Sequence, residues 1–572
     1  MQWHSYQNKE GVLKKSTLGM ILFIIMQLTI KSMAAEPSWE EGIAILKPRS
    51  NPYYLNPSDL REERQKGLWH AHHYPVAVTG MLPPYRPIKN ILNDEFKNPI
   101  KKWLNHFFKS LTQINSFDQM MLWLGLNEFP KDNDPLNPFE PGAFSEARPK
   151  YIGVSTLERQ GAQGFTLSCA VCHTSQLFGR TVVGLTNRFP RANEFFVKAQ
   201  TGFHFLQDQF FKQYAGATSN EMALFREAKL NIKSVGLKKP INLGLDTSLA
   251  QVSLSLSRRN QDELASKNSF FEENPRADLL ESQPADSKPA VWWNLKYKNR
   301  WLSDGSVVSG NPIYTNILWN EIGRGADLEK LEMWLQENEQ AIKQLTTAVF
   351  SIEAPKFVDF FSEEEIDISS AQRGEVVFNE HCSRCHGTYI KNWSLPEAQG
   401  MSLREKLLTF EVKYPQVTKV KDVGTDAFRY LGMSSLTKLN ELAISKKHQI
   451  IIKPQKGYVP PPLVGIWARW PYLHNNSIPS LCALLTPASQ RPKWFYQGPA
   501  NNSQTDFDKT CNGYPQAERA PISWKKNREL IVDTTKRGLG NFGHDEGIIT
   551  EQGKELLLKT EKMDLIRYLQ TL

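Results

Sequence analysis

Two short stretches, CAVCH at residues 169–173 and CSRCH at residues 382–386, decide how this sequence folds. In each, two cysteines stand two residues apart and a histidine follows at once, which is the attachment signature of c-type haem. The cysteines of such a motif form thioethers with the porphyrin, and the histidine is placed to bind the iron. The sequence therefore predicts two covalently bound haems. The residues expected to hold them are Cys169, Cys172, His173, Cys382, Cys385 and His386.

Two other kinds of site also use paired cysteines. Zinc knuckles normally lie about 15 to 20 residues apart, whereas these two pairs are roughly 210 residues apart in the sequence. A redox-active dithiol is compatible with an oxidising compartment, but it leaves the histidine after both pairs unexplained. Haem attachment is therefore the interpretation that we favour.

The N-terminal sequence predicts export. Three lysines precede an apolar run from Leu18 to Ile30, and the stretch SMAA follows at 32–35. This is the layout of a signal peptide, and the run is too short to span a bilayer comfortably. We expect a periplasmic or secreted protein, with an uncleaved membrane anchor as the alternative. In that compartment Cys482 and Cys511 are expected to form a disulfide rather than to stay free.

Composition and charge narrow the class of protein further. The chain has 572 residues, 40% of them apolar, and a formal net charge of +9. This apolar content excludes a disordered chain. The sequence also lacks the several long apolar runs that a polytopic membrane protein would have. Because no block of Lys or Arg occurs, we expect no nucleic acid as a partner. The mild positive excess indicates either a solvated surface or a basic rim for a small periplasmic electron-transfer protein.

Turn signals and helical periodicity divide the chain into four regions. We predict a signal peptide at 1–35, a loop-rich N-terminal wrapping segment at 36–149, a first haem domain at 150–355 and a second, cytochrome c-like haem domain at 356–572. The boundary before the second domain is a linker at 352–367. The fold class is mainly α, with two cytochrome c-like haem domains and long loop-rich insertions.

Three helices support this division. Asp327 is expected to cap a helix that carries apolar residues at helical spacing, and Ser370 to cap the helix that leads into Cys382. A closing helix ends the chain. The apolar positions of the first and last of these helices are Leu328, Leu331 and Leu335, and Leu565, Tyr568, Leu569 and Leu572.

Further motifs resemble those of a known family. YVPPPLVGIWA at 458–468 and PYLHNNSIPSL at 471–481 resemble bacterial di-haem c-type cytochromes of the rubber oxygenase and di-haem cytochrome c peroxidase superfamily. The resemblance covers roughly residues 150–572 and extends to GLTN at 184–187, RPK at 491–493 and GNFGH at 540–544. Asn476 stands where relatives usually have Gly, and Asn tolerates positive φ better than most residues. Arg469 and Trp470 replace small residues.

The resemblance also implies how the irons are ligated. It places His544 as the sixth ligand of the second iron, opposite His386. His474 is a rival that is otherwise a hydrogen-bonded core histidine, and Met433 and Met401 remain open because Met/His ligation is common in cytochromes c.

No distal motif is evident for the first haem. His204 is more simply a buried structural histidine. The resemblance implies an open face covered by apolar or aromatic side chains, so we predict that the haem of His173 is the reactive one. Trp292 and Trp293, and also Trp301, are expected to line this haem, to bridge the two haems, or simply to pack in the core.

Three functions follow from this set of residues. The leading one is an exported di-haem oxidoreductase whose first haem activates dioxygen, as in rubber oxygenases, and acts on an apolar organic substrate, with a second haem that tunes it or transfers electrons. A cytochrome c peroxidase reducing hydrogen peroxide would need a general acid/base near the haem, and the sequence singles out none. A non-enzymatic electron carrier rarely needs a chain of this length for two haems.

Overall fold

The computed structural model describes residues 37–73, 81–93, 114–143, 148–257 and 279–572, together with positions 95, 99, 102, 105, 106 and 109. The predicted signal peptide lies outside these residues. Among the described helices, none combines the length and the apolar character that a bilayer span requires.

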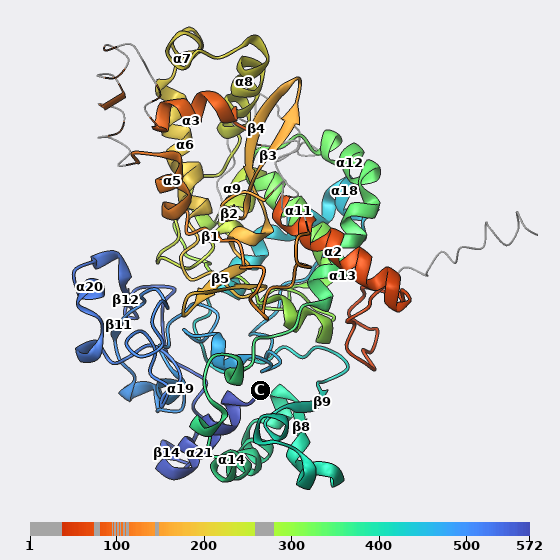
Figure 1. Cartoon of the computed structure of the whole chain (residues 1–572), viewed down its shortest axis with the longest axis vertical. Coiled ribbons are helices and arrows are strands. Elements are labelled where there is room, and N and C mark those ends of the chain that lie inside the picture. The colour runs from red at the N-terminus through yellow and green to blue at the C-terminus, as the bar shows by residue number, and fades with distance from the viewer. Residues whose placement is uncertain are drawn as a thin grey trace, which may run out of the picture.

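The fold is mainly helical, and its strands are short. Helices α3, α7 and α8 lie at one end of the molecule, and helices α14 and α21 lie at the other end (Figure 1). The α-helices are α2 (Pro57–His73), α3 (Tyr85–Asn93), α5 (Phe117–Trp123), α6 (Ala192–Phe205), α7 (Asp208–Ala215), α8 (Ser219–Lys233), α9 (Ser248–Ser257), α11 (Pro312–Gly323), α12 (Leu328–Glu337), α13 (Glu339–Ser351), α14 (Ile368–His381), α15 (Ser383–His386), α16 (Leu403–Lys406), α17 (Phe428–Gly432), α18 (Ala443–Lys447), α19 (Leu481–Leu484), α20 (Ile522–Lys525) and α21 (Lys559–Gln570).

The strands pair two by two, and all these pairs are antiparallel. They therefore brace loops rather than form a sheet that organises the core. The pairs are β1 (Asn127–Glu128) with β2 (Tyr151–Ile152), β3 (Val154–Arg159) with β4 (Ala162–Leu167), β5 (Thr174–Leu177) with β6 (Arg180–Val183), β7 (Val307–Ser309) with β10 (Ile451–Ile452), β8 (Thr388–Lys391) with β9 (Thr409–Lys413), β11 (Trp494–Tyr496) with β12 (Ile531–Asp533), and β13 (Thr550–Glu551) with β14 (Lys554–Glu555).

Two of the predicted helices are confirmed in position and orientation. Asp327 caps α12 by accepting hydrogen bonds from the backbone N–H groups of Glu329 and Lys330, and the three predicted leucines are buried. Helix α21 closes the chain and buries its predicted apolar face against α14. At this crossing a Cβ on Gly374 would lie 2.0 Å from the carbonyl oxygen of Asp564, so glycine is what lets the two backbones approach.

The cap of α14 was predicted wrongly. Asp367, not Ser370, accepts the hydrogen bond from the backbone N–H of Ser369 at the start of this helix. The hydroxyl of Ser370 instead donates to the carboxylate of Asp564 in α21. Asp367, three positions before Ser370, offers the same capping chemistry, because Asp and Ser are both favoured at the N-cap.

Within the predicted wrapping segment at 36–149, the described residues include one long helix. Helix α2 begins directly after Asn56, whose side chain accepts a hydrogen bond from the backbone N–H of Asp59. The helix packs along α13. The packing is close, because a Cβ on Gly67 would lie 1.9 Å from the carbonyl oxygen of Gln344. The sequence signal for this helix was the Asn-Pro start, since Pro is favoured at the first helical position.

The segment at 352–367, predicted as a linker, packs into the core. Phe357 and Phe361 in this segment are buried and pack against Trp467, with ring centroids 5.5 and 6.1 Å from that of the indole. One continuous apolar core therefore runs from the first haem motif through this segment to α21. The predicted boundary is a change of local structure rather than a break in the core.

Candidate haem sites

The first motif lies in a short connection between two strand pairs. The 3-10 helix η2 (Cys169–Val171) follows β4, and the hairpin of β5 and β6 begins directly after His173. The GLTN stretch at 184–187 then folds back on the motif. Gly184 donates to the carbonyl of His173 at 2.7 Å, and the side chain of Asn187 donates to the carbonyl of Val171 at 2.6 Å. The same stretch thus holds the middle and the C-terminal end of the motif.

The imidazole of His173 is oriented through its Nδ1 atom. This nitrogen lies 2.7 Å from the carbonyl oxygen of Ala290, and the indole of Trp292 lies beside the ring at 5.5 Å between centroids. A ring that donates from Nδ1 to a carbonyl presents Nε2 as its free lone pair, which is the usual arrangement of a metal-binding histidine. Burial lowers the pKa of His173 to about 4, so the ring is neutral, as a metal ligand must be.

The second motif shows the same arrangement on a different scaffold. Helix α14 delivers the chain into Cys382, and Cys385 and His386 lie on the short helix α15. The Nδ1 atom of His386 lies 2.8 Å from the carbonyl oxygen of Pro461, which is again a backbone acceptor far away in the sequence. Burial also lowers the pKa of His386.

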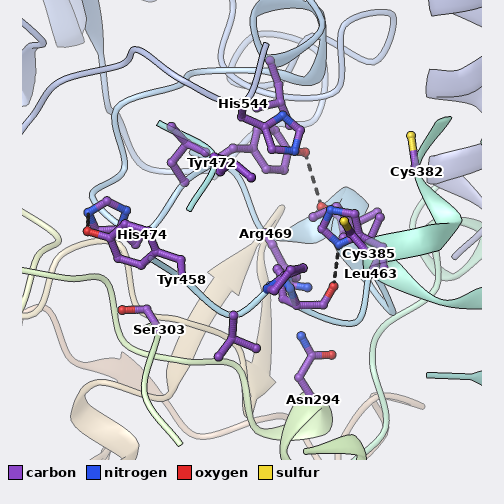
Figure 2. Close-up of a pocket in the computed structure, with 18 of the residues that line it drawn as sticks. Asn294, Ser303, Cys382, Cys385, Tyr458, Leu463, Arg469, Tyr472, His474 and His544 are labelled. Carbon is purple, nitrogen blue, oxygen red and sulfur yellow. Dashed lines mark hydrogen bonds between the residues drawn. The ribbon is translucent and has the colours of Figure 1, made fainter. Parts of the chain in front are cut away.

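His544 faces this second histidine. The two imidazole centroids are 6.3 Å apart, with ring planes at 52°. At the metal–nitrogen distance of about 2.0–2.1 Å that histidine ligands adopt, two imidazoles on opposite faces of one metal have centroids about 6 Å apart. The space between these rings therefore fits one iron. Figure 2 shows His544 projecting into this cavity, above the side chain of Cys385.

The loop that carries His544 is tied down by polar side chains. Arg491 donates to the carbonyls of Asn541 and Gly543 at 2.6 and 2.7 Å, and Asn475 donates to two further carbonyls of the same loop. His544 itself has a φ of +54°. Arg491 of the RPK stretch and Asn475 of the PYLHNNSIPSL stretch, both of which contributed to the resemblance, thus hold the loop of His544 in place.

In the part of the chain that the structure describes, the other candidates for the sixth position have no ring or lining contact that places them opposite His386. The imidazole of His474 stacks on the ring of Tyr458 at 4.0 Å between centroids, and its Nε2 lies 2.9 Å from the tyrosine hydroxyl. Met433 is buried in the core, and neither it nor Met401 lines the cavity around His386. The geometry therefore favours His544 over all three. His204 belongs to α6, but its side chain lies outside the described residues.

The three tryptophans have different surroundings. Trp292 and Trp293 lie on the 3-10 helix η4 (Trp292–Tyr297), and only Trp292 contacts His173 among the ring contacts of the described residues. Trp293 is fully buried and donates its indole N–H to the carbonyl of Val464 at 2.9 Å. Trp301 donates to the carbonyl of Gly310 and packs in the core against Trp39 and Phe350.

A cavity of about 270 Å³ occupies the second site. Apolar side chains form most of its wall, and the cysteines and histidine of the second motif form one part of it. Figure 2 shows Cys382 at one end of the cavity, His474 and Ser303 at the other, and Arg469 between them. The cavity thus has the apolar wall and the converging ligands that a covalently bound haem needs.

The alternative uses of the cysteines do not fit this geometry. Within the described part of the chain, no three His, Cys, Asp or Glu side chains lie close enough to hold a metal ion, so the two motifs do not combine into a zinc site. The four motif cysteines form no disulfide with one another. Burial raises the pKa of Cys169 to about 11 and that of Cys382 to about 12, whereas a redox-active dithiol needs a lowered thiol pKa.

The remaining two cysteines confirm a prediction. Cys482 and Cys511 form a disulfide that joins residues 29 positions apart. It fastens the segment after Leu481, a residue that lines the cavity of the second site.

Comparison with known proteins finds a family match in the segment that supports the second site. Residues 457–496 match the family model described as RoxA-like, cytochrome c-like. This chain therefore contains a RoxA-like cytochrome c segment. The match includes Pro461, which accepts from His386, and it implies covalently bound haem and a haem-based redox role.

Two relatives from Sinorhizobium fredii extend the comparison. The protein y4iJ is 23% identical over 474 residues, which are 71% of this chain and 76% of the relative. The protein y4iM is 29% identical over 220 residues, 36% of this chain and 49% of the relative. The names of both proteins state no activity. The first alignment extends the similarity well beyond the cytochrome c-like segment.

Proposed function

We propose that this chain is a di-haem oxidoreductase in which the haem attached at 169–173 binds and activates dioxygen, while the haem attached at 382–386 transfers electrons or tunes the first. The observation that carries this proposal is an asymmetry between the two histidines. His386 faces the imidazole of His544, whereas no ring contact among the described residues pairs His173 with a second imidazole. An iron with protein ligands on both faces passes electrons, and an iron with one free face binds small molecules.

Both motif histidines are suited to be the proximal ligands. Each holds its Nδ1 atom against a backbone carbonyl, and this orients Nε2 toward the place of the iron. Such a bond also increases the basicity of the ring. The assignment of His173, His386 and His544 as the iron ligands is part of this proposal.

The same carbonyls belong to one connected path between the two sites. Ala290 accepts from His173 and lies three residues before Trp293, whose indole donates to Val464. Val464 in turn lies three residues after Pro461, which accepts from His386. This path supports the bridging role for Trp293, whereas Trp292 is a residue beside the proximal ligand of the first haem.

The substrate that we propose is an apolar molecule with a carbon–carbon double bond. Cleavage of such a bond by dioxygen places one oxygen atom on each of the two carbons and needs no external reductant. The resemblance to rubber oxygenases and the RoxA-like match support this chemistry. The chain's contribution is to leave one face of the first haem free and to keep His173 neutral and oriented.

Export to an oxidising compartment is the setting that we propose. The N-terminal sequence has the layout expected of a signal peptide, and the disulfide of Cys482 and Cys511 is typical of such a compartment. A small electron-transfer protein is the proposed partner of the second haem.

The test is ligand binding to the purified holoprotein. Intact mass and haem staining should show two covalent haems, and the reduced protein should bind carbon monoxide or dioxygen at one of them. The double variant Cys169→Ser/Cys172→Ser should lose this binding, and the matched variant Cys382→Ser/Cys385→Ser should keep it. Binding that survives in the first variant would reverse the two roles. If neither haem binds carbon monoxide or dioxygen, the protein is an electron carrier. If the protein turns over hydrogen peroxide but not dioxygen, it is a peroxidase.

A further inference from the structure

The charged side chains that line the cavity of the second site are all basic. Among the residues that line it are five Lys or Arg side chains, and none of its lining residues is Asp or Glu. Arg384 and Lys421 lie at its exposed rim, but Lys288, Lys298 and Arg469 extend into its inner part. An apolar cavity that gathers cations without acids is arranged for an anionic group.

Among the described residues, no carboxylate forms an ion pair with Arg469. Its guanidinium donates to the carbonyl of Pro462 at 2.8 Å, and the nearby phenols of Tyr389 and Tyr472 act to raise its pKa. Burial lowers the pKa of Arg469 to about 10. A buried guanidinium is normally paired with a carboxylate or phosphate, because an unpaired one bears the full cost of desolvation.

The two lysines add to this imbalance. The ammonium of Lys288 donates to the carbonyls of Arg469 and Pro471, and its charged neighbours are the cations Arg469 and Arg188. Lys298 has one acid nearby, Asp304, which is already paired with Arg429 at 3.1 Å. Burial, together with the charge of Arg469, lowers the pKa of Lys298 to about 8.

The place of these cations matches one edge of a c-type haem. The thioether positions of this porphyrin lie on one edge, and its two propionate carboxylates lie on the opposite edge. Cys382 is at one end of the cavity, and Arg469 lies inward from it, toward Ser303 (Figure 2). The propionates therefore reach the side of the cavity where the cations are.

We infer that Arg469 and Lys298 bind the propionates of the second haem and, through their charge, raise its reduction potential. The inference rests on the proposed haem of this site. A fixed positive charge stabilises the iron after it has gained an electron, because the gain lowers the positive charge of the iron centre. The same cations lie on the inner side of the site, so they favour movement of an electron into this haem.

The test measures the midpoint potential of the low-spin haem by optical titration at a series of electrode potentials. Arg469→Gln and Lys298→Gln should each lower it by an amount equivalent to at least a tenfold change in the reduction equilibrium, which is about 59 mV for one electron. Arg469→Lys keeps the charge and should lower it less. The control is Arg567→Gln, which removes a half-buried cation that does not line the cavity.

Three results would overturn or redirect the inference. If Arg469→Gln and Lys298→Gln retain both haems with unchanged potentials, the cations do not act on the haem. If the potential of the unaltered protein changes with added phosphate at constant ionic strength, the cations bind an exchangeable anion and the inference is wrong. If Arg469→Gln yields no holoprotein, the midpoint potentials of Lys298→Gln and Arg469→Lys decide whether the cations act on the haem. Absence of the second haem from the unaltered protein would instead contradict the proposed function.

Discussion

Trp293 donates its indole N–H to the carbonyl oxygen of Val464 at 2.9 Å, and this bond joins the segment behind the first haem motif to the segment that supports the second. Gly465, next to Val464, packs on the same indole, where a Cβ would lie 3.2 Å from Nε1. Replacing Trp293 by Phe removes the bond and part of the ring. We expect slower electron transfer between the haems, measured by rapid mixing with a reductant, at unchanged haem content.

The control for this experiment is Trp301→Phe. Trp301 is equally buried and also donates to a carbonyl, that of Gly310, but it lies in the core away from the path. Both variants should lose about 1 kcal/mol of stability with the bond. If the two slow electron transfer equally, Trp293 acts through packing and not as a bridge.

The disulfide of Cys482 and Cys511 should stabilise the second site. It closes a loop of 29 residues, and Leu481 and Leu484 beside Cys482 line the cavity. The variant Cys482→Ser/Cys511→Ser should lower the free energy of unfolding by about 3 kcal/mol. Urea titration followed by haem absorbance measures this, with intact mass as the check on haem content. A loss below about 1 kcal/mol would mean that the loop is held by its other contacts.

Arg49 should anchor the segment before α2. Its guanidinium carbon lies 4.9 Å from the centre of Trp39 and 5.4 Å from that of Trp301, and the guanidinium donates to the carbonyl of Lys298. We expect Arg49→Ala to cost about 2 kcal/mol of stability, because the cation–π contacts and the hydrogen bond are lost together. Arg49→Lys keeps the charge but not the planar group, so it should retain only part of the stability in the same urea titration.

Local chemistry explains which parts of the site were predictable from sequence. The two haem motifs are contiguous, and the caps and apolar spacing of α12 and α21 act within one or two turns. His544 was identified by resemblance rather than by its own surroundings. Each of these motifs, caps and spacings depends on a few residues that are close together in the sequence.

The parts that escaped prediction depend on distant backbone atoms. The acceptors of His173 and His386 are the carbonyls of Ala290 and Pro461, and every residue type has a carbonyl, so no sequence pattern marks them. The cationic lining of the cavity escaped for a related reason. Its inner members, among them Arg469, come from segments far apart in the chain.

The neutral imidazole of His474 should make the fold sensitive to acid. Burial, with the nearby cations Arg429 and Lys288, lowers the pKa of His474 to about 3, whereas an unfolded histidine titrates near 6.5. The unfolded chain therefore binds the proton first, and stability falls as the pH drops from about 6.5 toward 3. His474→Gln should weaken this acid dependence in urea titrations repeated across the range. An unchanged slope would assign the dependence to other groups.

His544 is the residue whose replacement tests the second site most directly. His544→Ala removes the imidazole that lies 6.3 Å from His386 and leaves the attachment cysteines in place. We expect one low-spin haem to become high-spin in optical and electron paramagnetic resonance spectra, since the iron loses one of its two protein ligands. The matched control is His474→Gln, because His474 lines the same cavity but directs its Nε2 to Tyr458. The expected pair of results is a spin change in the first variant only. A spin change in the His474 variant, with none in the His544 variant, would transfer the distal position to His474 and would require the loop at 540–544 to serve the haem without ligating it.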